Sequence, residues 1–271
     1  SDRSDDQPNI MPEVYTRFLG DPNALLGGRW SLEVSGLALQ REGNDQDLNR
    51  ATVEGGWQKR HITSWGLVNT LDLSLRGDSY QVTDRDIARN TNRKSDASSV
   101  RGFANAHFKT SMPFEKSFET SQMVVEPIAA LTAGSNIEED NDIPNEDSID
   151  VFLDSTNIFN ANRFPGYDRI EDKPHATYGL RTGIYKDNGY QGEVFVGQSY
   201  RFDDDPADNP FPDGSGLSEQ ESDYVGNVSL RFGPHLDLTY DTQLANDNLA
   251  SQRHEFDASG TIGDLSLSTR Y

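Results

Sequence analysis

The side chains best suited to chemistry are five histidines, and none lies in a catalytic motif. Neither the Gly-x-Ser-x-Gly of many serine hydrolases nor the His-Glu-x-x-His of zinc proteases occurs in the chain. His107 is the strongest candidate, because it shares the polar side of an alternating segment with Ser99 and Asn105. Acid pairs such as Glu138-Glu139 belong to runs of charge. The sequence therefore predicts no enzyme, no catalytic residue and no cofactor. The histidines are His61, His107, His175, His235 and His254.

Charge is the second chemical feature, with 45 acidic against 24 basic residues and a net charge of -21. This excess argues strongly against a nucleic-acid partner. Residues 133–175 carry 11 acidic and 3 basic side chains, and residues 203–222 carry 7 acidic and none basic. Acidic loops usually keep a surface soluble, although they could hold divalent cations near an anionic partner. Neither segment has the ligand spacing of a calcium-binding hand, and the chain has no cysteine, so no metal site is predicted.

The segment 157–171 combines aromatic and guanidinium side chains inside the longest connection, residues 133–175. A structureless connection of that length is uncommon in a compact domain unless it is functional. Pro165-Gly166 favours a turn. The side chains that can pack are Phe159, Phe164, Tyr167 and Ile170. We therefore expect this loop to fold back onto the rest of the chain.

The arginines of that loop allow two interpretations. Arg163 and Arg169 could meet anionic phosphates. Alternatively they pair with Asp168 and Glu171 and hold the shape of the loop, which is the interpretation we favour.

Alternation of apolar and polar residues predicts strands along nearly all of the remaining chain. In residues 66–81 the leucines fall on one face and polar side chains on the other. Asp187-Asn188-Gly189 predicts a tight hairpin, and Pro127 predicts a bulge or bend. No helical pattern is present. The expected strands are 10–18, 29–40, 50–61, 66–81, 98–110, 117–132, 176–186, 190–202, 223–232, 236–243, 253–262 and 265–271.

The connections between these strands alternate in length. The short ones lie around 63–64, 111–116, 187–189, 233–234 and 263–264. The long ones are 41–49, 82–97, 133–175, 203–222 and 245–252, while 19–28 is intermediate and fits less well. Short and long connections therefore fall at opposite ends of an up-and-down sheet, which is typical of bacterial outer-membrane barrels.

Strand length and aromatic placement agree with a membrane barrel. Several segments exceed the ~5–6 residues usual in soluble sheets and approach the ~9–11 of a membrane strand. Aromatic residues gather near strand ends, where a membrane interface would lie. Those near short turns are Trp65, Tyr185, Tyr190 and Phe232, and those near long loops are Tyr80, Tyr178, Tyr200, Phe202 and Tyr240. A soluble β-sandwich is the alternative, but it predicts shorter strands and evenly spaced turns.

Residues 159–170, Phe-Asn-Ala-Asn-Arg-Phe-Pro-Gly-Tyr-Asp-Arg-Ile, resemble the Leu-Phe-x-x-Asn-Arg-x-Ser-Gly-x-Asp-Arg-Ile segment of the LptD family of LPS-assembly proteins, also called the organic-solvent-tolerance family. Three weaker matches keep the family order. They are Met-Pro-Glu-Val at 11–14, Gln-Met-Val-Val-Glu-Pro at 122–127 and Val-Gly-Gln-Ser-Tyr-Arg-Phe at 196–202.

The resemblance implies an all-β, antiparallel, up-and-down transmembrane β-barrel of about 26 strands in the outer membrane of a Gram-negative bacterium. Residues 1–271 would be an internal fragment of it with about 12 strands, and 133–175 would be its long extracellular or lumenal loop. The opening residues 1–8 are polar and show no signal peptide. A complete barrel of about 12 strands is the structural alternative, because Leu265, Leu267 and Tyr271 imitate the last strand of one.

The resemblance also implies a function without covalent chemistry. The family inserts lipopolysaccharide into the outer leaflet, with an LptE-like lipoprotein plug in the lumen and an LptA-like periplasmic bridge reached through an N-terminal domain. The residues expected to gate or shape the outer mouth are Asn162, Arg163, Phe164, Gly166, Tyr167, Asp168 and Arg169. A porin or structural barrel is the alternative, and composition alone does not separate the two.

Overall fold

A computed structural model describes residues 9–41, 46–86, 94–137, 142–148, 151–203, 205, 209–263 and 265–271. Residues 1–8 and the Glu138-Glu139 pair lie outside this part of the chain. Within it the strands form one antiparallel sheet, and the only other regular element is a short 3-10 turn, η2 (Leu25–Gly27). No helix among the described residues is long and apolar enough to cross a membrane. The strands are β1 (Asn9–Leu19), β2 (Arg29–Gln40), β3 (Asp47–Ile62), β4 (Val68–Asp86), β5 (Lys94–Ser111), β6 (Phe114–Ser117), β7 (Ser121–Gly134), β8 (His175–Lys186), β9 (Tyr190–Arg201), β10 (Tyr224–Phe232), β11 (Leu236–Leu244), β12 (Ser251–Ile262) and β13 (Leu265–Arg270).

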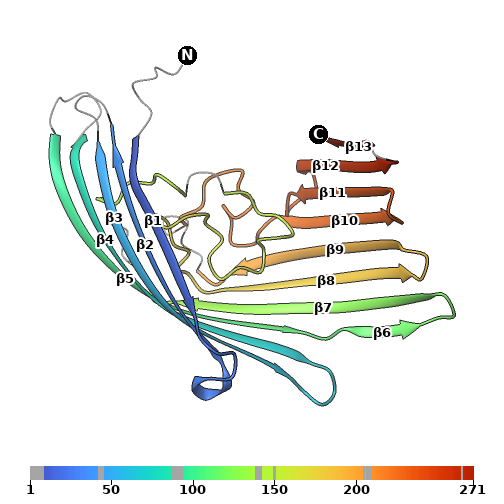
Figure 1. Ribbon diagram of the computed structural model, residues 1–271. Helices are drawn as coiled ribbons and strands as arrows, with labels where there is room; N and C mark the ends of the chain where they lie inside the picture. Colours follow the sequence, from blue (N-terminus) through green and yellow to red (C-terminus); the bar gives the residue numbers. More distant parts are fainter. Residues whose placement is uncertain are drawn as a thin grey trace.

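Neighbours in the sheet are neighbours in sequence, which confirms the up-and-down prediction. The order runs β1-β2-β3-β4-β5-β7 and on to β13, with β6 paired to β7 beside the line of β5. Without β6, the path has the expected 12 strands. Among the described residues β1 and β13 do not pair with each other, so the sheet is not closed. Figure 1 shows β1 to β5 rising steeply while β7 to β13 run across, so that the sheet curves into a trough. This is the form of a partial barrel.

One predicted turn was wrong. The segment 111–116 was expected to be a short connection, but β6 occupies its second half, and the turn lies at 118–120, where the Phe118 N–H donates to the Ser121 carbonyl at 2.7 Å. The ladder with β7 is interrupted at Pro113, which has no N–H to donate, although the Met112 N–H still donates to the Pro127 carbonyl at 3.2 Å. The register is the same on both sides, Ser111 with Ile128 and Phe114 with Val125. The sequence predicted a bulge or bend at Pro127. The strands keep the same register on both sides of this residue, so it is not the site of a bulge.

The sheet has an apolar outer face and a polar concave face, as the alternation predicted. On β5, Val100 and Phe108 are exposed on the outside, while Asn105 and His107 are buried on the concave side. Register aligns one polar row across six strands on that side: Gln58, Asp72, His107, Thr132, His175 and Arg201. Tyr80 was grouped with the interfacial aromatics, but it is fully buried on the concave face.

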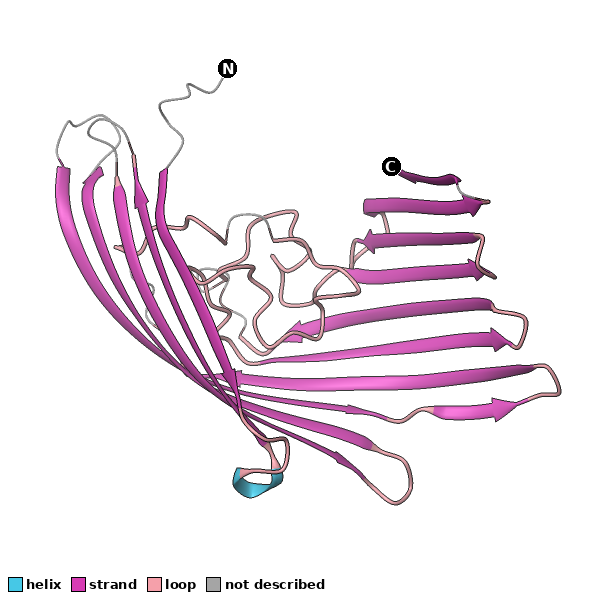
Figure 2. Cartoon of the chain, in the orientation of Figure 1, coloured by secondary structure: helices cyan, strands magenta, loops and turns pink. Residues whose placement is uncertain are grey.

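Loops, and not a second sheet, cover the concave face. Figure 2 shows the described parts of the connection between β7 and β8, residues 135–137, 142–148 and 151–174, lying inside the trough. Two apolar clusters join this connection to the strands. One contains Val151, Leu153, Ile158, Phe164, Phe195, Phe211, Leu217 and Val225. The other contains Leu39, Leu48, Tyr80, Val82 and Ile143. Two face-packed sheets, as in a sandwich, are not what the described residues form.

Candidate functional site

The candidate site consists of segment 157–171 and the surface of the sheet on which it rests. A tight turn at residues 154–157 leads into the segment. The Asp154 carboxylate accepts hydrogen bonds from the N–H groups of Thr156 at 2.8 Å and Asn157 at 3.0 Å. Such an aspartate turn is a local alternative to regular structure. It directs Ile158 toward the sheet, where this side chain is fully buried.

The wall beneath Ile158 is shaped by glycine. Phe195 of β9 lies over Gly179 and Gly197, because a Cβ at either position would fall within 2.9 Å of its ring. A Cβ on Gly197 would also lie 3.3 Å from Ile158. Phe159 meets the edge of the Phe195 ring at a centroid distance of 6.0 Å. The two glycines therefore leave the space in which the start of the segment is anchored.

Arg163 and Glu171 form a buried ion pair within the loop, as the favoured interpretation predicted. Arg163 Nε donates to Glu171 Oε2 at 2.8 Å, and Arg163 Nη2 donates to Oε1. His175 Nδ1 lies 3.2 Å from the same carboxylate. Burial opposes ionisation of Glu171, but the positive charge of Arg163 outweighs it and lowers the pKa of that carboxyl. Asn162 completes the turn, since its Oδ1 accepts from the N–H groups of Phe164 and Glu171.

Phe164 connects the segment to the second acidic loop. Its ring stacks on Phe211 with centroids 4.5 Å apart and planes 7° from parallel. Both side chains are buried. The two long loops therefore pack together on the concave side.

Two aspartates clasp each other's backbone at the Pro165-Gly166 turn. The Asp147 carboxylate accepts from the N–H groups of Tyr167 and Asp168, both at 3.0 Å. In return, the Asp168 carboxylate accepts from Glu146 N–H at 2.8 Å and Asp147 N–H at 3.2 Å. Gly166 has φ of +73°, and a Cβ there would lie 2.4 Å from the Asp147 carboxylate. Only glycine fits this position without strain.

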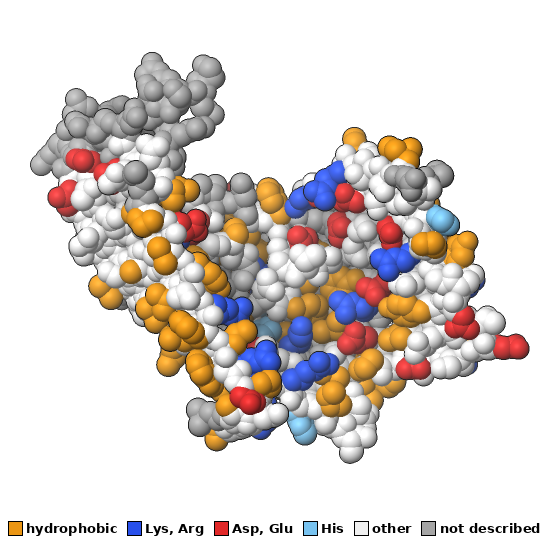
Figure 3. Space-filling view, in the orientation of Figure 1, with side chains coloured by type: hydrophobic (Ala, Val, Ile, Leu, Met, Phe, Trp, Pro, Cys, Tyr) orange, Lys and Arg blue, Asp and Glu red, His pale blue; other side chains and the backbone are white. Residues whose placement is uncertain are grey.

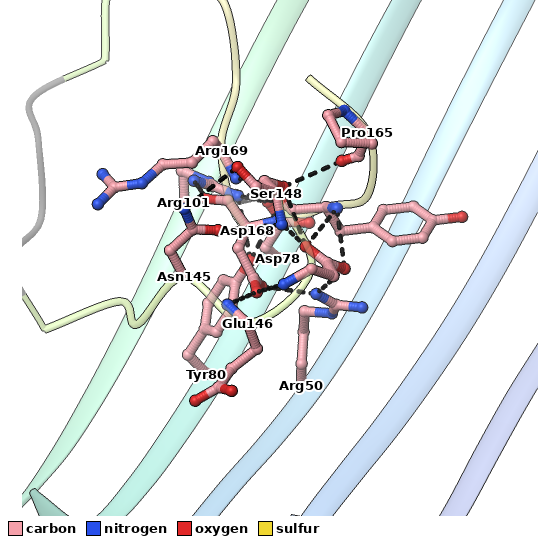
Figure 4. Close-up of polar contacts among 12 residues, drawn as sticks. Arg50, Asp78, Tyr80, Arg101, Asn145, Glu146, Ser148, Pro165, Asp168 and Arg169 are labelled. Carbon is pink, nitrogen blue, oxygen red and sulfur yellow. Dashed lines mark hydrogen bonds and ion pairs between the residues drawn. The ribbon is translucent and has the colours of Figure 1, made fainter. Parts of the chain in front are cut away.

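Arg50 of β3 binds both members of this clasp. Its Nη1 lies 2.6 Å from Asp147 Oδ2 and 2.6 Å from Asp168 Oδ1 (Figure 4). Burial raises the pKa of Asp168, and the adjacent Asp147 carboxylate adds to this effect. Burial also opposes ionisation of Asp147, but Arg50 and the backbone N–H groups prevail and lower the pKa of Asp147. One guanidinium thus bridges a pair of carboxylates and offsets part of their mutual repulsion.

Tyr167 is held between two arginines of the wall. The guanidinium carbons of Arg50 and Arg76 each lie 5.0 Å from the centre of its ring, within cation–π range. Its hydroxyl donates to Glu33 Oε1 at 2.6 Å. Burial, and then the hydrogen bond to Glu33, raise the pKa of Tyr167. The phenol is therefore a neutral donor.

The strands of the wall also bind the backbone of the dipeptide Tyr167-Asp168. Arg101 of β5 donates to the carbonyls of Tyr167 and Asp168, each at 2.8 Å, and Arg76 donates to the Tyr167 carbonyl. Asp78 lies between these arginines, 2.8 Å from Arg76 and 2.7 Å from Arg101. The Tyr80 hydroxyl also donates to the Tyr167 carbonyl, at 3.3 Å. We call Glu33, Arg50, Arg76, Asp78, Tyr80 and Arg101 the wall cluster.

The seven predicted site residues do not all enter this cluster. Tyr167 and Asp168 contact it directly, whereas Asn162, Arg163 and Phe164 stabilise the loop and its neighbour. The Arg169 guanidinium points away from the clasp (Figure 4), while its N–H donates to the Ser148 hydroxyl at 3.3 Å. Asp168 was expected to pair inside the loop, but its partner is Arg50, 118 positions earlier in the chain.

The wall cluster and Asp147 were not predicted as site residues. Arg101 lies in the predicted strand 98–110 and Asp147 lies in the acidic segment 133–175, but neither residue was singled out. His107 was grouped with Ser99 and Asn105, yet its Nδ1 lies 2.8 Å from the Thr132 hydroxyl on the adjacent strand. Among the described residues, no group of three or more acidic, histidine or cysteine side chains is placed to hold a metal ion.

A cavity of about 630 Å³ lies below the segment on the short-turn side of the trough. Its roof is Phe159, Asn160 and Ala161, and the strands contribute cationic and anionic side chains. The charged residues are Arg60, Asp72, Lys109, Glu126 and Arg181. The loop therefore covers the polar interior of the trough at the wall cluster and leaves this cavity on the side of the short turns.

Comparison with known proteins places these features in a family context. A family model described as "LptD: LPS transport system D" matches residues 1–271. The LPS-assembly protein LptD of Escherichia coli (strain K12) is 29% identical over 239 residues, covering 83% of this chain and 30% of that protein. The protein of that name from Shigella dysenteriae serotype 1 matches to the same extent. That from Pseudomonas putida (strain GB-1) is 39% identical over 64 residues, 23% of this chain and 7% of that protein. The chain spans less than a third of the length of these curated relatives.

Proposed function

The chain belongs to the LptD family, and on that premise we propose that its parent protein inserts lipopolysaccharide into the outer leaflet of the outer membrane of a Gram-negative bacterium. We propose further that residues 1–271 are part of its β-barrel domain. The substrate is then lipopolysaccharide. The partners are a lipoprotein plug of the LptE kind and a periplasmic bridge of the LptA kind.

The two faces of the sheet support this assignment. A barrel wall needs an apolar outer surface toward lipid and a polar inner surface toward water. Val100 is 81% exposed and Leu75 is 68% exposed on the outer face. The inner face carries the polar row that ends at Arg201. Movement of an amphiphile past such a wall needs no bond to be made or broken.

The contact between the loop and the wall cluster is the observation that carries the proposal furthest. Asp168 is 1% exposed and reaches Arg50 across the trough. A loop held by a buried ion pair, a cation–π pair and backbone recognition at one dipeptide is a fixed closure. We propose that it closes part of the outer mouth of the barrel. Arg163 is already paired with Glu171, so it acts as a structural residue in this proposal and not as a phosphate ligand.

Deletion of residues 157–171 from the full-length parent tests the closure. The strain should become sensitive to bulky antibiotics at normal protein levels, because the wall would no longer be covered. Unchanged resistance would contradict the proposed role of the loop.

A separate experiment tests the transport function. When the parent protein is depleted, newly made lipopolysaccharide should fail to reach the cell surface, as measured by surface-restricted chemical labelling. A porin or structural barrel predicts normal surface lipopolysaccharide and ion conductance by the purified protein.

A further inference from the structure

The cavity beneath the start of segment 157–171 has a charged lining that the closure of the mouth does not use. Its volume is about 630 Å³, and Phe159, Asn160 and Ala161 lie over it. The rest of its lining comes from the inner faces of β3, β4, β5, β7 and β8. Figure 3 shows Lys and Arg side chains gathered along the concave face of the trough. We call this space the lower cavity.

Two of the three cations that line the lower cavity are unmatched. Arg60 of β3 and Lys109 of β5 form no hydrogen bond and no ion pair with any residue that the structure describes. The third cation, Arg181, is matched, because it lies 3.4 Å from Glu126 and 3.4 Å from Glu193. Two unpaired cations in one cavity are a local exception in a chain whose net charge is -21.

The register of the sheet brings these two cations to the same place. Arg60 and Lys109 both pair with Thr70 of β4, one from each neighbouring strand. Their strands are therefore about 10 Å apart, which is twice the spacing of paired strands, and two long side chains can reach one small ligand between them. Asp72, two positions along β4, accepts from Gln58 Nε2 at 2.6 Å and forms no ion pair with either cation. Two positive charges thus face one carboxylate.

His107 is a second and independent sign of a ligand. Its side chain is only 5% exposed, yet it lines the lower cavity two positions from Lys109 on β5. Its Nδ1 lies 2.8 Å from the Thr132 hydroxyl. Its Nε2 has no hydrogen-bond partner among the described residues and keeps accessible surface, which opens into this cavity. Because the Thr132 hydroxyl can donate to Nδ1, the Nε2–H is available to donate to a ligand.

These donors select an anion with several oxygens. A metal ion is disfavoured by the two cations, and the part of the chain that the structure describes has no metal-binding group of three. A neutral ligand would leave both charges unmatched. The oxygens of a phosphate can accept from a guanidinium, an ammonium and an imidazole N–H at once. We propose that the lower cavity binds a phosphate group, held by Arg60, His107 and Lys109.

The site deepens the proposed function and rests on it in one respect. In an outer-membrane barrel the short turns lie on the periplasmic side, so the lower cavity would face the periplasm. The phosphate is then one carried by the saccharide of lipopolysaccharide, held below the closed mouth. Free phosphate has the same chemistry, and the choice of probes separates the two sources.

Calorimetric titration of the full-length parent, purified with its partners in phosphate-free buffer of low ionic strength, tests the site. The probes are the phosphorylated core oligosaccharide freed of its lipid, the same oligosaccharide after dephosphorylation, and inorganic phosphate. We expect the first to bind with a Kd on the order of 1 mM and the second not to bind. Added salt should weaken binding, because exposed charges carry the attraction. Equal affinity for inorganic phosphate would identify the phosphate alone as what the cavity binds.

Substitutions assign the binding to named residues. Arg60→Gln and Lys109→Gln should each weaken it about three- to tenfold. Neither should unfold the protein, because both side chains are exposed and unpaired. Arg60→Lys keeps the charge and should retain most of the affinity, whereas His107→Phe should weaken binding. Lys59→Gln is the matched control, because Lys59 lies on the opposite face of β3, where it donates to the Leu26 carbonyl at 3.0 Å, and its variant should bind as the unmodified protein does.

Three results would overturn the site. These are no binding of either phosphate-bearing probe, equal affinity in the unmodified protein and in the Arg60→Gln and Lys109→Gln variants, or equal binding of the dephosphorylated oligosaccharide. Loss of a co-purifying lipoprotein from these variants, with phosphate binding unchanged, would mean that the cations pair with a protein carboxylate instead.

The surface-labelling experiment is independent of these titrations. Phosphate binding together with normal surface lipopolysaccharide after depletion would overturn the transport function and leave the phosphate site standing. Failed surface delivery after depletion, without phosphate binding, would overturn the site and leave the transport function standing.

Discussion

Arg50 places one guanidinium nitrogen 2.6 Å from the carboxylates of both Asp147 and Asp168. These partners lie 97 and 118 positions away in the sequence. No local pattern announces such a contact, which is why sequence reasoning found Asp168 and missed Arg50. The Arg163–Glu171 pair spans only eight positions, and it was predicted from the loop composition.

Removal of Arg50 should release the loop. Arg50→Met leaves Asp168 buried without its cation, and breaking a buried pair in this way costs about 3–5 kcal/mol. Hydrogen exchange of peptides covering 157–171 in the folded full-length protein should become faster. Arg17→Met is the matched control, because Arg17 makes a long 3.8 Å contact with Glu33 and is 54% exposed. Equal exchange in the two variants would refute a structural role for Arg50.

Acid should loosen the same segment through Glu171. The pKa of Glu171 in the folded protein lies below its ordinary value. Its contribution to docking is therefore complete above the unfolded pKa and is lost as the pH falls through the folded one. Asp168 has a raised pKa and contributes with the opposite sign. Exchange of the 157–171 peptides should rise in acid, and Glu171→Gln should remove much of this rise. An identical pH profile in the variant would exclude Glu171 as the cause.

A comparison of Gly166 with Gly214 separates backbone strain from steric crowding by neighbouring side chains. Gly166 and Gly214 have φ of +73° and +81°, but a Cβ would meet Asp147 at 2.4 Å only at Gly166, and nothing within 4 Å at Gly214. Both alanine variants bear a backbone cost of about 1–2 kcal/mol. Gly166→Ala should lower the thermal stability of the full-length protein further. A smaller loss for Gly166→Ala than for Gly214→Ala would contradict the clasp geometry.

At the scale of elements, strands were the most predictable part of the chain. Period-2 alternation gave β2 with its correct ends, Arg29–Gln40, and placed most other strands within a few residues. The break at Met112-Pro113 was missed, because the strand resumes in register after it. Tyr80 was misplaced because proximity to a long loop does not tell which face a side chain occupies.

The anchoring of the loop by β9 can be tested with a pair of substitutions on that strand. Gly197→Ala would press against Phe195 and Ile158, so the turn at 155–160 should exchange faster. Gly192→Ala lies on the outer face, with Leu230 at 3.4 Å as its nearest neighbour, and should be neutral or slightly stabilising. Protection of 155–160 that is unchanged by Gly197→Ala would exclude this anchor.

At the scale of the whole molecule, strand number and connectivity followed from the sequence, whereas the curvature did not. Curvature arises from the twist of many paired strands and from what fills the concave side. The folding back of the loop was predicted from its length and its apolar side chains, and the apolar clusters around Phe195 and Tyr80 supply its physical reason. Composition contributed little to the prediction. A barrel with a polar inner wall has a low mean hydropathy, and so does a soluble protein, so this quantity does not separate the two.

The sheet leaves β1 and β13 paired on one side only. Unpaired strand edges are templates for association. The isolated 271-residue chain should therefore aggregate at concentrations where the full-length parent stays dispersed, as measured by light scattering in the same detergent. A monodisperse isolated chain would indicate that these edges are protected in another way.

The contact of Asp168 with Arg50 is the claim on which the closed mouth depends, and a double-mutant cycle measures it most directly. Arg50→Met, Asp168→Asn and the double variant are made in the full-length parent, and the opening free energy of 157–171 is taken from hydrogen exchange. A coupling of about 1.5–3 kcal/mol is expected for a charged hydrogen bond. Strictly additive effects would mean that the loop is not held by this pair.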